Sequence, residues 1–145
     1  MSMIDVFRSL GKSDALKLRE EASRMSGTQI IEQEHSAPAF DPKKDYSAWP
    51  VGAPVTDEGQ VWLLIQPYIA AHYEGRPSTL RALWGIAHTK DPKRAKPWAE
   101  PFGTSGMYMQ GECYKAADGK VYRAKQDNLV WTVTDYPDGW EEVDA

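Results

Sequence analysis

The residues of this chain that could do chemistry are few and widely separated. Its three histidines are His35, His72 and His88, and their spacing does not match a close set of metal ligands. His72 and Glu74 could act as an acid–base pair, but the polar stretch around them favours a solvated loop. The histidines therefore predict neither a metal site nor a catalytic pair.

The possible nucleophiles are equally isolated. The stretch Gly103-Thr104-Ser105-Gly106 lacks the spacing of a nucleophile elbow. The single cysteine, Cys113, excludes an intrachain disulfide and a cysteine-based zinc site, and a reduced, partly buried strand residue is expected there. The sequence also contains no glycine-rich phosphate loop. We therefore expect a protein that is not an enzyme and that uses no cofactor or metal.

Aromatic side chains are the remaining candidates, because the chain contains six Trp and seven Tyr. Exposed aromatic rings can stack on the apolar faces of sugars. Trp131 and Tyr136, in a predicted loop, could do this, and Tyr122 and Trp140 are further candidates for glycan or partner binding. The alternative, that the rings cover a small sheet, is favoured because Trp is usually well buried.

A pattern that occurs twice sets the positions of these rings. Each copy has an aromatic residue before a glycine, a strand-type residue after it, a second glycine followed by another aromatic, and a closing Trp. The positions are Trp49, Gly52, Val55, Gly59, Trp62 and Trp84 in the first copy and Tyr108, Gly111, Tyr114, Gly119, Tyr122 and Trp140 in the second. Such self-similarity indicates two copies of one supersecondary unit.

The pattern predicts a mainly β fold, with two small antiparallel β modules after a helical N-terminal segment. The turns at 57–60 and at Asp118-Gly119 should reverse the chain, since Asp-Gly supplies the positive φ that hairpins need. Val55 and Tyr114 belong to first strands, and 61–66 and 120–125 return as second strands. The run 61–65 is apolar throughout, which is typical of a strand buried on both faces. The expected segments are 1–36 helical, 40–87 first module, 88–102 linker and 103–145 second module.

The N-terminal segment could pack on its own chain or on a neighbouring subunit. Residues 2–10 could form a short helix, and 29–32 could be helix or strand. A short apolar stripe follows, made of Ala15, Leu18, Ala22 and Met25. The sequence does not decide whether this stripe packs on its own chain or on a neighbouring subunit. Because modules this small bury little apolar area alone, we expect self-association through this segment, shared with the modules.

The charge and hydropathy of the chain limit the kinds of partner that it is expected to bind. The formal net charge of −4 argues against nucleic acid, which would require a basic field. No apolar run approaches membrane-spanning length, and the N-terminus lacks the apolar core of a signal peptide. The linker 88–102 is basic and Pro-containing, and although it could attract an anionic glycan or phosphate, a solvated connector is favoured. We expect synthesis in a host cytoplasm.

The second copy resembles the type-3 chitin-binding modules, the small carbohydrate-binding modules of families 5 and 12. The matching residues are Tyr108, Gly111, Glu112, Tyr114, Gly119, Tyr122, Ala124 and Trp140. The first copy resembles the family more loosely, through its own repeat positions. The family usually follows its Tyr-x-Ala with one or two Trp that stack on polysaccharide, whereas this chain has Lys125-Gln126 there.

Two further stretches resemble structural proteins of tailed bacteriophages. They are 127–131 with 136–141, and 45–50 with 59–62. In such proteins these modules occur in tail, fibre or capsid-decorating components. The resemblance implies a non-enzymatic virion protein that self-associates, with a trimer favoured by analogy, and that contacts other virion proteins and a host-surface glycan. The alternatives are a glycan-binding module for a chitin- or peptidoglycan-like polysaccharide, or an accessory part of a cell-wall hydrolase.

Overall fold

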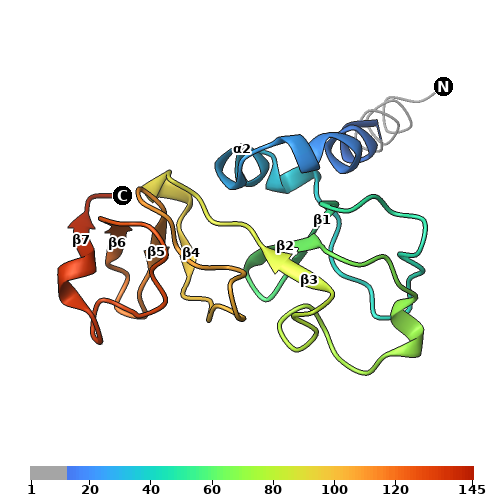
Figure 1. Cartoon of the computed structure of the whole chain (residues 1–145). Helices are drawn as coiled ribbons and strands as arrows, with labels where there is room; N and C mark the ends of the chain where they lie inside the picture. Colours follow the sequence, from blue (N-terminus) through green and yellow to red (C-terminus); the bar gives the residue numbers. More distant parts are fainter. Residues whose placement is uncertain (1–12) are drawn as a thin grey trace.

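The protein consists of two small β sheets side by side, with helical turns packed along one side (Figure 1). The structure, a computed structural model, describes residues 13–145. The short helix expected for 2–10 therefore lies outside the described residues. Within 13–145, no helix combines the length and the apolar character that crossing a membrane requires.

The helical segment contains several short elements. Residues 13–21 are helical and lead into η1 (Ala22–Arg24), followed by α2 (Gly27–Glu32) and η2 (Glu34–Ser36). Ser26 caps α2, because its hydroxyl accepts from the Gln29 backbone N–H at 3.2 Å while the Gln29 side chain accepts from the Ser26 N–H at 2.9 Å. This reciprocal capping box explains why 29–32 is a helix rather than a strand.

The apolar stripe of this segment packs within the chain. Leu18 and Ala22 are each only 2% exposed, whereas Ala15 is half-buried. Ala22 shares a buried cluster with Val61 of the first sheet, and Met25 packs against it. Of the two packings left open by the sequence, the structure shows the contact with the chain's own first module.

The first sheet is a three-stranded antiparallel meander. Its strands are β1 (Pro54–Asp57), β2 (Gln60–Leu64) and β3 (Trp84–Ile86), in that order. Glu58 and Gly59 join β1 to β2 with φ of 51° and 73°, so that both residues adopt the left-handed conformation of a two-residue hairpin turn. Ile65, expected at the end of a fully buried run, lies just beyond β2 and is exposed.

The second sheet contains two strands that were not expected. Its order is β4 (Lys96–Pro97), β5 (Cys113–Lys115), β6 (Val121–Ala124) and β7 (Trp140–Val143). The pair β5–β6 is the antiparallel hairpin that the sequence predicts, β7 adds a third antiparallel strand at the closing Trp, and β4 pairs with β5 in parallel. A parallel neighbour requires a long connection, and here 98–112 supply it. Although β3, β4 and β7 were not among the expected strands, the prediction of a mainly β fold with two sheets is confirmed.

The two modules share one backbone scheme. The Gly52 N–H donates to Leu64 O at 2.8 Å, and the equivalent Gly111 N–H donates to Ala124 O at 2.9 Å. In the pairing of the last two strands of each meander, Leu64 lies opposite Trp84 and Ala124 opposite Trp140. Both glycines have positive φ, of 93° and 91°. The sequence repeat is thus a repeat of hydrogen bonds as well as of residue types.

The stretch 88–102, expected to be a linker, is held on both sides. Toward the helical segment, the Lys90 N–H donates to Thr28 Oγ1 at 2.9 Å, and the Lys96 ammonium pairs with Glu34 at 2.6 Å. Toward the second module, the Cys113 N–H donates to Thr89 O at 2.8 Å. The Lys96 side chain and the backbone of this stretch therefore have specific partners, and the stretch joins the modules as part of the fold.

Gly27 allows α2 to approach this stretch. A Cβ atom at position 27 would overlap the backbone carbonyl oxygen of His88. We expect Gly27→Ala to lower the free energy of unfolding by about 2 kcal/mol, because backbone on both sides must move. Urea denaturation measures this. Gly85→Ala is the matched control, since its Cβ would make only ordinary contacts, with Ile65 side-chain atoms at 3.6 Å and with Leu63 O at 3.7 Å. Equal losses in both variants would contradict the close approach at Gly27.

Candidate binding surfaces

The exposed aromatic pair of the second module is Trp131 with Tyr136. Trp131 is 53% exposed, and its ring lies edge-on to that of half-buried Tyr136, with centroids 5.8 Å apart and planes at 78°. The Trp131 carbonyl oxygen accepts a hydrogen bond of 2.8 Å from Trp140 Nε1, which fixes the backbone beneath the exposed ring. The structure therefore brings these two predicted residues together at the surface.

The other two predicted aromatic residues lie elsewhere. Trp140 is 4% exposed and packs in the second core with Tyr108 and Tyr114, with its centroid 4.8 Å from that of Tyr114. It supports the sheet and presents no face to a ligand. Tyr122 is half-buried and lines a hollow of about 480 Å³ on the second sheet, together with Trp98. The four candidates thus form one exposed pair, one core residue and one groove residue.

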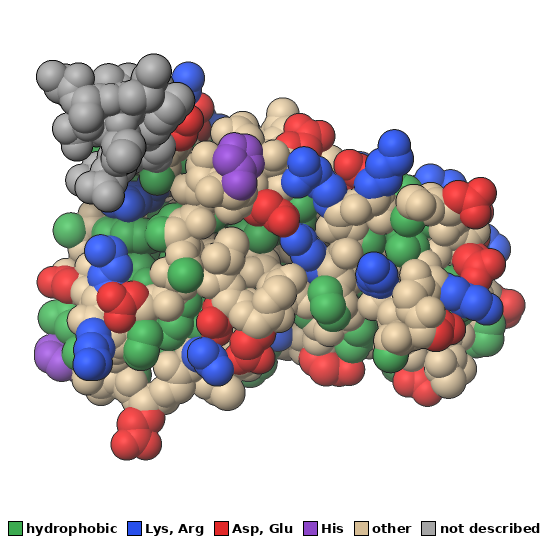
Figure 2. Space-filling view, turned by 180° about the vertical axis from the view of Figure 1, so that it is seen from behind, with side chains coloured by type: hydrophobic (Ala, Val, Ile, Leu, Met, Phe, Trp, Pro, Cys, Tyr) green, Lys and Arg blue, Asp and Glu red, His purple; other side chains and the backbone are tan. Residues whose placement is uncertain are grey.

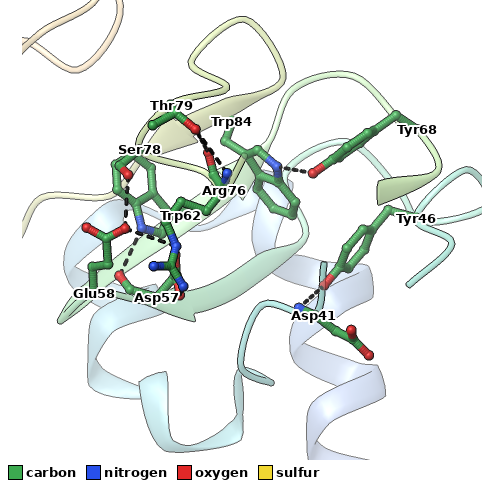
Figure 3. A network of polar contacts seen from close by, with 10 residues as sticks. All are labelled: Asp41, Tyr46, Asp57, Glu58, Trp62, Tyr68, Arg76, Ser78, Thr79 and Trp84. Atoms are coloured by element: carbon green, nitrogen blue, oxygen red, sulfur yellow. Dashed lines mark hydrogen bonds and ion pairs between the residues drawn. The ribbon is translucent and has the colours of Figure 1, made fainter. Parts of the chain in front are cut away.

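The first module has an aromatic core of the same kind. Trp84 is completely buried, and its Nε1 donates to the Tyr68 hydroxyl at 2.8 Å. The Tyr46 ring meets Trp84 edge-on at 5.4 Å, and its hydroxyl accepts from the Asp41 N–H at 2.9 Å. Figure 3 shows both hydrogen bonds at the heart of the module. Burial is the main cause that raises the pKa of Tyr46 and of Tyr68, so both hydroxyls stay protonated.

A polar network fastens the long loop between β2 and β3 to the β1–β2 turn. Arg76 Nε lies 3.0 Å from Asp57 Oδ2 and 3.1 Å from Glu58 Oε1, and the Ser78 hydroxyl donates to the same Glu58 oxygen at 3.0 Å (Figure 3). The Arg76 N–H is capped by Thr79 Oγ1 at 3.0 Å. Because each carboxylate has a partner, this cluster holds the loop against the β1–β2 turn.

His88 lies where the two modules meet. Its ring stacks on Tyr108 with centroids 3.7 Å apart and planes at 17°, and its Nε2 is 2.8 Å from Gly106 O. Burial, with a smaller contribution from the nearby Arg81 charge, lowers the pKa of His88 to about 4, so the ring is neutral at physiological pH. Among residues 13–145, no three or more His, Cys, Asp and Glu side chains cluster as metal ligands.

Cys113 is a buried strand residue, as the sequence predicts. Its Sγ approaches Gly111 O at 3.6 Å. Burial raises the pKa of the Cys113 thiol to about 11, so the thiolate that would act as a nucleophile is scarcely formed at physiological pH. The other residues considered for chemistry, His72, Glu74 and His35, are all exposed.

Sequence reasoning missed a second hollow, of about 290 Å³, between the modules. Gln60, Trp62 and Arg81 line it from the first module, and Trp98 lines it from the stretch expected to be a linker. Trp98 could have been found as the one Trp in a stretch rich in polar and basic residues. Gln60 and Arg81 carry no local signal, because their neighbours come from distant parts of the chain.

The surface charges are mixed. In Figure 2, Lys and Arg side chains alternate with Asp and Glu over the visible face, with hydrophobic side chains between them. This distribution gives no broad single-sign field of the kind that attracts nucleic acid.

Comparisons with known proteins give no family for this chain. No protein-family model matches it, and no curated protein matches it. The function is therefore argued from the sequence motifs, the repeated fold and the surfaces described above.

Proposed function

We propose that the chain is a non-enzymatic structural component of a bacteriophage virion, in the tail, in a fibre or on the capsid. The observation that supports this role most directly is the tandem β module, which occurs twice with one hydrogen-bond scheme. The motifs that resemble tailed-phage structural proteins lie in both copies. The catalytic groups that would suggest an enzyme are exposed and scattered or, like Cys113, buried and protonated.

The surface of the chain fits a role in an assembly. Large hydrophobic side chains that are at least half exposed are Leu16, Val51, Tyr73, Phe102 and Trp131. Exposed apolar groups that lie together are typical of surfaces that bind other proteins. The proposed partners are other virion proteins and further copies of the chain, with a trimer favoured by analogy. In this role the helical segment, packed on the first module, would join copies through its outer side, where Leu16 lies.

Mass spectrometry of purified particles tests the virion role. The chain should be present in particles of the phage that encodes it, at a copy number in whole multiples of the oligomer. Sedimentation equilibrium of the full chain at micromolar concentration should give an oligomer. Particles without the chain would overturn the virion role, and a monomer would overturn only the self-association.

A second candidate function is glycan binding, and the exposed Trp131–Tyr136 pair supports it. An exposed indole held on a fixed backbone can stack on the apolar face of a sugar of a chitin- or peptidoglycan-like polysaccharide. If this pair is the glycan site, Trp131→Ala should weaken such binding about tenfold, which corresponds to about 1.4 kcal/mol. A glycan site elsewhere on the chain would leave the binding of this variant unchanged. Binding to insoluble chitin and to peptidoglycan measures the effect. Phe102→Ala, which removes an equally exposed ring from another surface, is the control and should leave binding unchanged.

A further inference from the structure

Two hollows of the molecule share Pro97 and Trp98 in their linings. The larger of these two, of about 480 Å³, extends over the second sheet, and the smaller, of about 290 Å³, reaches the first module. Because they adjoin at these two residues, they are together called here the intermodule groove. Together they have the size of a small-molecule site.

Two half-buried aromatic rings, Trp98 and Tyr122, line the larger hollow, and Trp98 also lines the smaller one. Trp62, which occupies the position of Tyr122 in the first repeat, lines the smaller hollow but is only 3% exposed, with the Arg81 guanidinium over its ring. The Trp98 ring stacks on Tyr108 at 4.9 Å and its Nε1 donates to Glu100 Oε1 at 2.8 Å, so its orientation is fixed without a ligand. A surface fixed in this way binds with a smaller loss of conformational entropy.

One buried polar group in the groove has unused hydrogen-bonding capacity. Gln60 is 6% exposed, and its Nε2 donates to Pro97 O at 2.6 Å. Its Oε1 is buried and has no hydrogen-bond partner among the described residues. A buried acceptor without a partner costs about 1–3 kcal/mol, which a donor from a ligand would recover. Gln60 therefore points to a ligand that carries hydrogen-bond donors.

The charges along the groove argue against a strongly charged ligand. The charged side chains that line it are Glu58, Arg81, Glu100, Lys115 and Asp118. Acidic and basic groups are thus interspersed, without the basic cluster that phosphate or nucleic acid requires. Hydroxyl groups also line it, from Ser78, Thr132 and Thr134.

We propose that the intermodule groove binds an extended, uncharged oligosaccharide. The Trp98 and Tyr122 rings would stack on the C–H faces of successive sugars, and a sugar hydroxyl, which can donate and accept, would reach Gln60 Oε1. This inference rests on the proposed contact with a surface glycan and gives that contact a site. The site differs from the Trp131–Tyr136 pair, which lines neither hollow.

Titration of the full chain with β-1,4-linked hexasaccharides of N-acetylglucosamine, glucose and mannose tests the proposal by calorimetry. At least one hexasaccharide should bind, and tenfold more tightly than its disaccharide, because a disaccharide cannot occupy both hollows. Gln60→Leu and Tyr122→Leu should each weaken binding at least fivefold. Trp131→Leu, the matched control outside the groove, should leave the dissociation constant unchanged.

Ala117→Arg provides a test that leaves the core intact, because Ala117 is exposed and lines the larger hollow. Its added side chain should block that hollow and weaken binding at least fivefold, with the unfolding midpoint unchanged. A loss of binding in Trp131→Leu but not in Ala117→Arg would place the sugar on the exposed pair and overturn the groove. Failure of all three hexasaccharides to bind the folded chain would also overturn it. Particle incorporation, which tests the virion role, would be unaffected by either result.

Discussion

Replacing Trp84 with alanine is expected to lower the free energy of unfolding by about 4 kcal/mol, the range found for a fully buried Trp. Trp84 has no exposed surface, and Phe40 and Tyr46 both meet its ring edge-on. The substitution would leave a cavity among these rings. It would also remove the indole N–H that donates to the Tyr68 hydroxyl (Figure 3), leaving that buried oxygen without its donor.

Denaturant unfolding, followed by near-ultraviolet circular dichroism, measures this loss. Trp131→Ala is the matched control, since it deletes the same side chain where 53% of it is exposed, and should change stability by less than about 0.5 kcal/mol. Trp84→Phe should fall between them, because it keeps most of the ring packing but loses the N–H. Similar losses in Trp84→Ala and Trp131→Ala would contradict the assignment of Trp84 to the core.

The features that the sequence predicts well are those with local causes. The hairpin at Glu58-Gly59 and the turn that contains Gly119 require positive φ, and glycine marks such positions. The closing Trp residues recur because each small sheet needs one large apolar side chain to cover it, and both Trp84 and Trp140 are buried. Local turn chemistry and hydrophobic spacing thus sufficed for the two hairpins, β1–β2 and β5–β6, but not for the third strands, β3 and β7.

The features that the sequence does not predict depend on distant partners. Lys96–Pro97 has no alternation of apolar and polar residues, and it is a strand because Tyr114 and Lys115 lie beside it. The exposed fraction of a side chain depends equally on distant parts of the chain. Nothing near Trp131 or Trp140 distinguishes the exposed ring from the buried one, and their difference arises from the path of 129–140 over the sheet. The intermodule groove has walls from five separate stretches, 58–62, 78–81, 97–100, 114–122 and 132–134, so no single motif marks it.

Acidification is expected to destabilise the protein through His88. Burial lowers the pKa of His88 to about 4, below the value of about 6.5 that it has in an unfolded chain. Protonation therefore favours the unfolded state. The stability that the neutral ring supports is fully present above about pH 6.5 and is lost as the pH falls toward 4. At about 1.4 kcal/mol for each pH unit, the total loss is about 3 kcal/mol.

Comparison with His88→Gln isolates this contribution. Glutamine does not titrate in this range and keeps an N–H donor that can reach Gly106 O, while carboxylates common to both proteins cancel in the difference. Between about pH 7 and pH 4, the free energy of unfolding of the wild-type chain should fall by about 3 kcal/mol more than that of the variant. Parallel profiles would contradict a buried, neutral His88. The His88 ring stacks on Tyr108 of the second core, and the His88 backbone lies against Gly27 of α2. Protonation of the ring should therefore weaken the junction between the modules first.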